Sequence, residues 1–146
     1  MSEDQTKIEM VIDSIRANQV NHDRMVILKE KQGNRVVSIW IGDFERFIIA
    51  GKIRGISPSK SSPYELMCTI INLLGGTVKE VIFNYLRNDM FYTAITISGT
   101  DGERVIDCLP SAALALAMTA DVPIFMLESV LLKASLTMDE DINKTS

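Results

Sequence analysis

The chain has 146 residues and a net charge of −4, with 47% hydrophobic and 23% charged residues. This length and balance are typical of one globular domain with its own core, and they exclude a chain that is disordered throughout. An acidic chain with a pI near 5.0 also lacks the overall basic charge of dedicated nucleic-acid binders, whose affinity depends on neutralising phosphates.

Nothing in the sequence indicates a membrane protein or a secreted one. No apolar run reaches the roughly 18 residues of a membrane span, and the first residues lack the apolar region of a signal peptide. Cys68 and Cys108 both lie in apolar sequence, which favours buried free thiols over a disulfide. We therefore expect a cytoplasmic protein with one domain over residues 8–136, and flexible polar ends at residues 1–7 and 138–146.

The first strands are predicted by alternating apolar residues and by turn formers. Residues 8–17 predict a strand, and a loop rich in turn formers follows it. The strands expected over residues 24–30 and 35–41 are joined by the glycine-containing turn at residues 31–34, so they form a hairpin that Gly42 ends.

Two helices are predicted next. Asp43 is expected to cap the first, which Gly51 helps to end. Ser61 or Ser62 is expected to cap the second, with Pro63 at its first position. Five apolar residues of this second helix fall on one face: Leu66, Met67, Ile70, Ile71 and Leu74.

The second half of the chain repeats this plan. Strands are expected at residues 77–86, 90–98, 103–109 and 124–127. Helices are expected at residues 111–120 and 128–134. The halves align at a shift of 69 residues, which places the Gly33 turn over the Gly102 turn. We therefore predict an α+β fold with two similar hairpin-then-helix halves, mainly antiparallel sheets, and helices on one face.

Ser111 lies at a junction between a strand and a helix, where a nucleophile is sometimes presented. A nucleophilic serine needs a neighbouring base, and nothing in the sequence pairs Ser111 with His22, the one histidine. We interpret Ser111 as the cap of its helix.

Carboxylates are the second group of candidates for chemistry. Glu45 and Glu65 lie at the starts of two helices, where the helix dipole stabilises negative charge, and Asp107 lies at the end of a strand. If the two halves pack together, these three side chains converge on one cleft and act as catalytic groups. Oxygen ligands of this kind suit Mg²⁺ or Mn²⁺, with Glu45 and Glu65 as the metal ligands.

A basic stretch lies between these two glutamates. Arg46, Lys52, Arg54 and Lys60 occur there with several serines and no acidic residue among them. Such a stretch can bind phosphate through its side chains and through a helix N-terminus, and a solvated loop is the alternative interpretation. Trp40 stands between Ile39 and Ile41, so its strand has apolar side chains on both faces. The second face must meet a helix or a partner chain, which makes a homodimer the expected assembly.

Several stretches together resemble the bifunctional nuclease domain family. They are VVSIWIGDFER at residues 36–46, LMCTIINLLGGTVKEVIF at 66–83, FYTAITI at 91–97 and PSAALALAMTADVPIF at 110–125. The resemblance extends from about Arg24 to Leu132. It implies an α+β fold first catalogued among hypothetical proteins, often dimeric, and an ability of some members to degrade DNA and RNA.

This chain departs from the family pattern at polar positions. Where relatives show a His-Asp pair, it has Tyr64 and Glu65, and where they show Arg-Pro-Ser-Asp, it has Leu109 to Ala112. Two hypotheses follow. The first is a nuclease-like phosphodiesterase that uses a divalent metal, with Arg46 or Lys60 at the phosphate. The second is a non-catalytic module that keeps the fold to bind a partner or a ligand.

Overall fold

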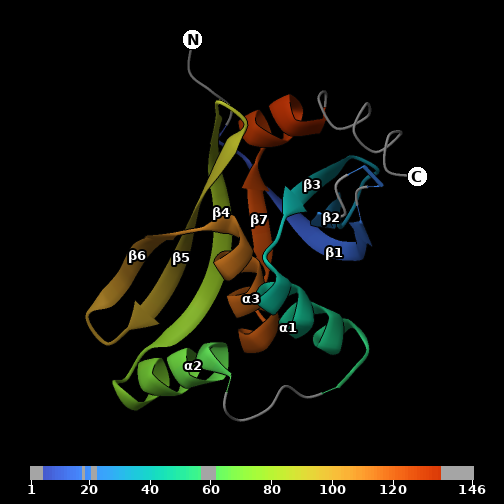
Figure 1. The fold of residues 1–146 in the computed structure, drawn as a ribbon. Helices are drawn as coiled ribbons and strands as arrows, with labels where there is room; N and C mark the ends of the chain where they lie inside the picture. Colours follow the sequence, from blue (N-terminus) through green and yellow to red (C-terminus); the bar gives the residue numbers. More distant parts are fainter. Residues whose placement is uncertain (1–4, 18, 21–22, 57–61, 136–146) are drawn as a thin grey trace.

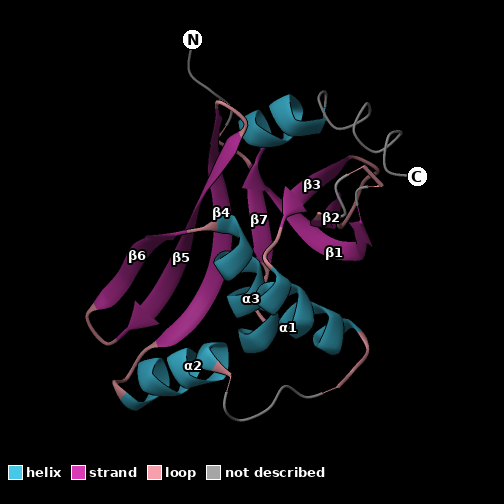
Figure 2. Cartoon of the chain, in the orientation of Figure 1, coloured by secondary structure: helices cyan, strands magenta, loops and turns pink. Residues whose placement is uncertain are grey.

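A computed structural model describes residues 5–17, 19–20, 23–56 and 62–135 (Figure 1). Its strands are β1 (Lys7–Ala17), β2 (Arg24–Glu30), β3 (Val36–Trp40), β4 (Thr77–Arg87), β5 (Met90–Gly99), β6 (Gly102–Cys108) and β7 (Ile124–Leu127). Its helices are α1 (Asp43–Ile53), α2 (Pro63–Leu73), α3 (Pro110–Ala120) and a last helix over residues 128–135. Figure 2 shows these helices and strands in the same orientation.

The described strands form a single mixed sheet in the order β3-β2-β1-β7-β4-β5-β6. The predicted hairpins are present and the strand pairing is mainly antiparallel, as predicted, but the hairpins join one continuous sheet instead of separate sheets. All its neighbouring pairs are antiparallel except β4 and β7, which are parallel. The parallel pair arises because β7 follows α3, and a helical crossover returns the chain in the direction of β4.

The order of strands is symmetric about β7. A three-stranded antiparallel meander lies on each side of it, β1-β2-β3 on one side and β4-β5-β6 on the other. Each meander leads into a helix of 11 residues, α1 or α3. Each half therefore ends as a hairpin followed by a helix, and the two helices lie beside each other in Figure 1.

The core is centred on α3, which packs against α1, α2 and strands of both halves. Five consecutive residues of α3, from Ala113 to Ala117, are at most 2% exposed. Three of these five residues are alanines, and small side chains let neighbouring backbones approach closely. The alanines of α3 therefore allow α1 to pack close to it.

The helix caps agree only in part with the sequence prediction. Ser62 caps α2 by accepting a hydrogen bond from the backbone N–H of Tyr64, as predicted. Asp43 is not a cap, because Gly42 holds the cap position of α1 and Asp43 lies in the first helical turn. The apolar face of α2 is largely outside the core, with Leu66 57% and Leu74 83% exposed.

Candidate functional site

Three side chains from the first turns of three helices meet at one point. Glu45 comes from α1, Tyr64 from α2 and Ser111 from α3. The Tyr64 hydroxyl donates to Oε2 of Glu45 at 2.9 Å, and the Ser111 hydroxyl lies 3.4 Å from Oε1 of Glu45. The Glu45 carboxylate therefore has a hydrogen-bond partner at each oxygen. We call these three residues the Glu45 cluster.

Local structure explains why these side chains meet. Prolines at the first positions of α2 and α3 fix where both helices begin, and the Ser62 cap orders the turn that carries Tyr64. The ring of Phe44 stacks on Tyr64 at a centroid distance of 6.2 Å. Glu45 lies in the first turn of α1, where the helix dipole favours its negative charge.

The interpretation of Ser111 as a helix cap is wrong. Leu109 occupies the cap position of α3, because Pro110 is already the first helical residue. A residue inside the first turn cannot occupy the cap position, which belongs to the half-helical residue that precedes the helix. The Ser111 oxygen instead accepts a hydrogen bond from the backbone N–H of Gly42 at 3.2 Å, which links α3 to the start of α1.

Tyr64 is held in its neutral form. Its side chain is only 6% exposed, and burial raises its pKa, with further contributions from the hydrogen bond and the charge of Glu45 and from nearby Cys108. Burial also raises the pKa of the Cys108 thiol, which the hydrogen bond from Thr93 partly offsets. Both groups therefore keep their protons at neutral pH, and Tyr64 acts as a hydrogen-bond donor to Glu45.

The structure brings only some of the basic residues that were predicted to bind phosphate into one pocket. Arg46 and Arg54 line a pocket of about 320 Å³ together with Arg16 and Arg24, and we call it the arginine pocket. Lys52 lies in the last turn of α1 but does not line this pocket. Lys60 falls outside the described residues.

The structure does not gather all three predicted catalytic carboxylates. Glu65 lines a different pocket, with Cys68 and Thr69, and Asp107 is an exposed residue of β6. Within the described parts of the chain, no three histidine, cysteine, aspartate or glutamate side chains lie close enough to hold a metal ion. The two cysteines are free thiols and each is half-buried.

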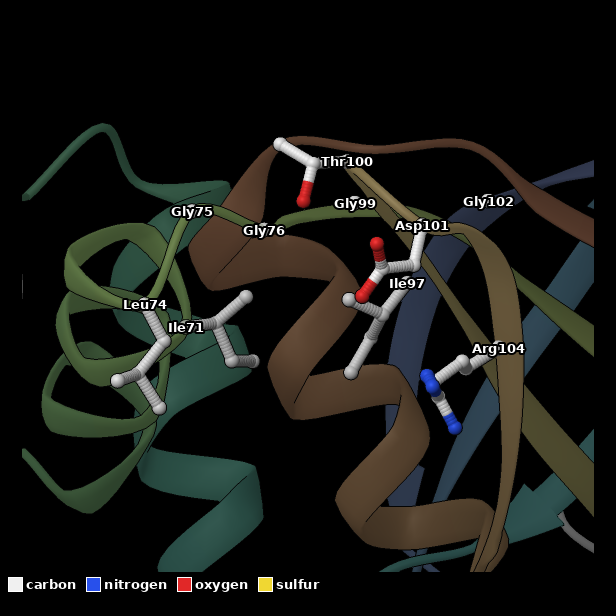
Figure 3. Close-up of a pocket in the computed structure, with 10 residues that line it drawn as sticks. All are labelled: Ile71, Leu74, Gly75, Gly76, Ile97, Gly99, Thr100, Asp101, Gly102 and Arg104. Atoms are coloured by element: carbon white, nitrogen blue, oxygen red, sulfur yellow. The ribbon is translucent and has the colours of Figure 1, made fainter.

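A further pocket of about 370 Å³ lies between the end of α2 and the turn that joins β5 to β6. Figure 3 shows Ile71 and Leu74 on the α2 side, and Asp101 and Arg104 on the hairpin side. None of the residues predicted to be functional lines this pocket.

Sequence reasoning did not identify Arg16 and Arg24 as part of a site. Their proximity follows from the pairing of β1 with β2, in which Ala17 lies opposite Arg24. The loop rich in turn formers between these strands indicated such a hairpin, so a signal was present. Only the three-dimensional packing of α1 against this end of the hairpin adds Arg46 and Arg54.

Comparisons with known proteins show the family to which this chain belongs. The family model described as "Bifunctional nuclease domain" matches residues 26–139, and the chain belongs to this family. The chain is 30% identical over 133 residues to each of two proteins of Mycobacterium tuberculosis strains, "Uncharacterized protein MT1877" and "Uncharacterized protein Rv1829". Each match covers 91% of this chain and 79% of the relative.

No helix among the described residues is long and apolar enough to cross a bilayer.

The raised pKa of Tyr64 predicts how stability depends on alkaline pH. An unfolded tyrosine ionises near pH 10, roughly, whereas folded Tyr64 keeps its proton to a higher pH. Its contribution to the free energy of unfolding is therefore complete below about pH 10 and is lost as the pH rises through the folded-state pKa. Urea unfolding, measured from roughly pH 8 upward, should show that the free energy of unfolding falls more steeply with pH in the wild type than in Tyr64→Phe.

Tyr64→Phe should lower the free energy of unfolding by roughly 1–3 kcal/mol at neutral pH, because a hydrogen bond to a charged group is removed. Tyr92→Phe is the matched control, since Tyr92 is 49% exposed. Equal pH profiles for wild type and Tyr64→Phe would contradict this assignment of Tyr64.

Proposed function

We propose that this domain is a nuclease-like phosphodiesterase acting on DNA or RNA, with Glu45 as its general base. One observation carries the proposal: Glu45, positioned by two hydrogen bonds, is followed directly by Arg46, which lines a pocket with three other arginines. Consecutive residues of α1 thus supply a proton acceptor and a phosphate-binding group. Membership of the bifunctional nuclease domain family supports the same class of substrate.

The chemistry can be assigned to residues of this chain. An ionised carboxylate has about four acceptor positions, so Glu45 can accept a proton from water while Tyr64 and Ser111 keep it in place. The oxygen of that water attacks phosphorus, one P–O ester bond breaks, and the departing oxygen takes a proton from solvent. Arg46 neutralises charge on the phosphate oxygens as it builds up.

The divalent metal stays a prediction. Both oxygens of Glu45 have hydrogen-bond partners within the protein, and Glu65 lines a different pocket. These described residues do not provide an assembled ligand set, so no step of the proposed reaction passes through a metal. Assays with Mg²⁺, Mn²⁺ and EDTA test the requirement directly.

The proposal predicts that Glu45→Gln abolishes cleavage of single-stranded and double-stranded DNA and RNA. Loss of a general base typically lowers a rate by roughly 10²–10⁴-fold, because the proton acceptor is removed while the shape is kept. A time course on labelled substrates measures this, with Glu103→Gln as the control, because Glu103 is half-exposed and pairs with Lys79 on the β6 side of the sheet.

Two further variants, Glu65→Gln and Asp107→Asn, test whether the other predicted carboxylates take part. Cleavage by Glu45→Gln at the wild-type rate would refute the role of Glu45. Equal cleavage by the wild type and every variant would indicate a contaminating nuclease.

A non-catalytic binding module is the second candidate function. One observation favours it: the partner of Glu45 is Tyr64, a neutral side chain that keeps its proton at neutral pH. Nucleic-acid binding without cleavage by the wild type, under every metal condition, would select this candidate over the phosphodiesterase.

We also propose that the chain forms a homodimer through the β3 edge of the sheet. Trp40 on this edge strand is 51% exposed, although Ile39 beside it is buried. A large aromatic side chain that no described helix covers is typical of an interface residue.

The dimer proposal predicts that Trp40→Glu shifts the mass in solution from dimer to monomer, because a charge would be buried between the chains. Light scattering after size exclusion measures the mass. Met90→Glu, at an exposed position on a distant hairpin, should leave it unchanged. A wild-type protein that is monomeric at all concentrations would rule the dimer out.

A further inference from the structure

The arginine pocket is built from two distant parts of the chain. Arg16 and Arg24 come from the paired ends of β1 and β2, Arg46 comes from α1, and Arg54 is the C-cap residue of α1. Arg46, Ala50 and Arg54 follow each other at intervals of four residues, which places them on one side of the helix. Two small side chains, Ala17 and Ala50, also line the pocket.

The described residues do not balance the positive charge in this pocket. Among them, no carboxylate lines the pocket, and no ion pair involves any of its four arginines. The chain has 19 acidic residues against 15 basic ones, so acidic partners are plentiful. Arg35 shows the usual arrangement, since it binds both Glu30 and Glu128.

One of these guanidinium groups also has an unsatisfied donor. Nε of Arg46 is buried and has no hydrogen-bond partner among the described residues. A buried donor without an acceptor is energetically unfavourable, and so is the gathering of four like charges in one pocket. An anionic ligand with several oxygen acceptors would remove the cost of the gathered charges.

We propose that the arginine pocket binds a phosphate group that carries more than one negative charge, such as a terminal phosphomonoester or pyrophosphate. A phosphomonoester carries roughly −1.5 to −2 at pH 7, whereas an internal phosphodiester carries one charge and matches four arginines less well. Arginine binds phosphate through two parallel hydrogen bonds, so several guanidinium groups can share one such group. The volume of about 320 Å³ falls in the range of small-molecule sites, which begins at roughly 300 Å³.

The inference rests on the proposed function for one point, the source of the phosphate. If the domain cleaves nucleic acid, the pocket holds the phosphorylated end of a strand and thereby sets which end is bound beside Glu45. A free nucleotide presents the same group, so the experiment must separate the two sources.

The test is calorimetric titration of the intact chain at low salt with inorganic pyrophosphate. Further titrations use AMP, adenosine, and oligonucleotides with and without a terminal phosphate at the 5′ or the 3′ end. We expect pyrophosphate and terminally phosphorylated ligands to bind, and their unphosphorylated partners to bind at least roughly tenfold more weakly, because charged hydrogen bonds are lost. Preference for phosphorylated oligonucleotides over AMP assigns the strand end as source, and the reverse assigns a free nucleotide.

Matched variants show whether the pocket itself is responsible. The double variant Arg16→Gln, Arg24→Gln should weaken pyrophosphate binding roughly tenfold or more. The control is the double variant Arg87→Gln, Arg104→Gln, which makes the same charge change outside the pocket and should not weaken binding. Ala50→Leu keeps all four arginines but fills the space between them, and should weaken binding as well.

Glu45→Gln should bind pyrophosphate like the wild type, so failure of catalysis and failure of this inference are distinguishable. The inference is overturned if the wild type binds no phosphorylated ligand, or if both double variants lose binding equally.

Discussion

The buried helix α3 is the constraint on which the other features depend. Its residues from Ala113 to Ala117 are almost fully enclosed, and it touches α1, α2 and both halves of the sheet. Because three of these five residues are alanines, α1 packs close enough for Ser111 and Gly42 to form a hydrogen bond between the starts of the two helices. These two positions differ by 111 − 42 = 69 residues, which is the shift that relates the two halves of the sequence. The Glu45 cluster therefore sits where equivalent parts of the halves meet.

The helix α1 separates two kinds of surface. Glu45 faces the first turns of α2 and α3, and its carboxylate is fixed by neutral donors. The next residue, Arg46, lines the pocket formed with β1 and β2. Neutral donors hold the Glu45 carboxylate, and the arginines of the arginine pocket make no ion pair with described residues. A stable core needs neither arrangement, because Arg35 elsewhere is fully paired with carboxylates. Functional sites commonly retain such locally unfavourable arrangements because binding a ligand compensates for them.

Most of the fold was predictable from the sequence, and much of the site was not. Alternation and turn residues located the strands to within a residue or two, and β2 and β7 match their predicted bounds. The parallel pairing of β4 with β7 was not predicted, because it depends on where the crossover through α3 returns the chain. Glu45 was identified as a carboxylate at the start of a helix, but its partners Tyr64 and Ser111 were interpreted as a departure from the family pattern and as a cap. Those roles are set by contacts between helices, which local sequence does not encode, and the same holds for Arg16 and Arg24.

The most direct test of this account is a crystal structure of the Glu45→Gln variant bound to a short oligonucleotide with a terminal phosphate. The account predicts that the terminal phosphate lies among Arg16, Arg24, Arg46 and Arg54, and that the next phosphodiester lies beside residue 45. A terminal phosphate ordered elsewhere on the surface, with the arginine pocket unoccupied, would contradict the account.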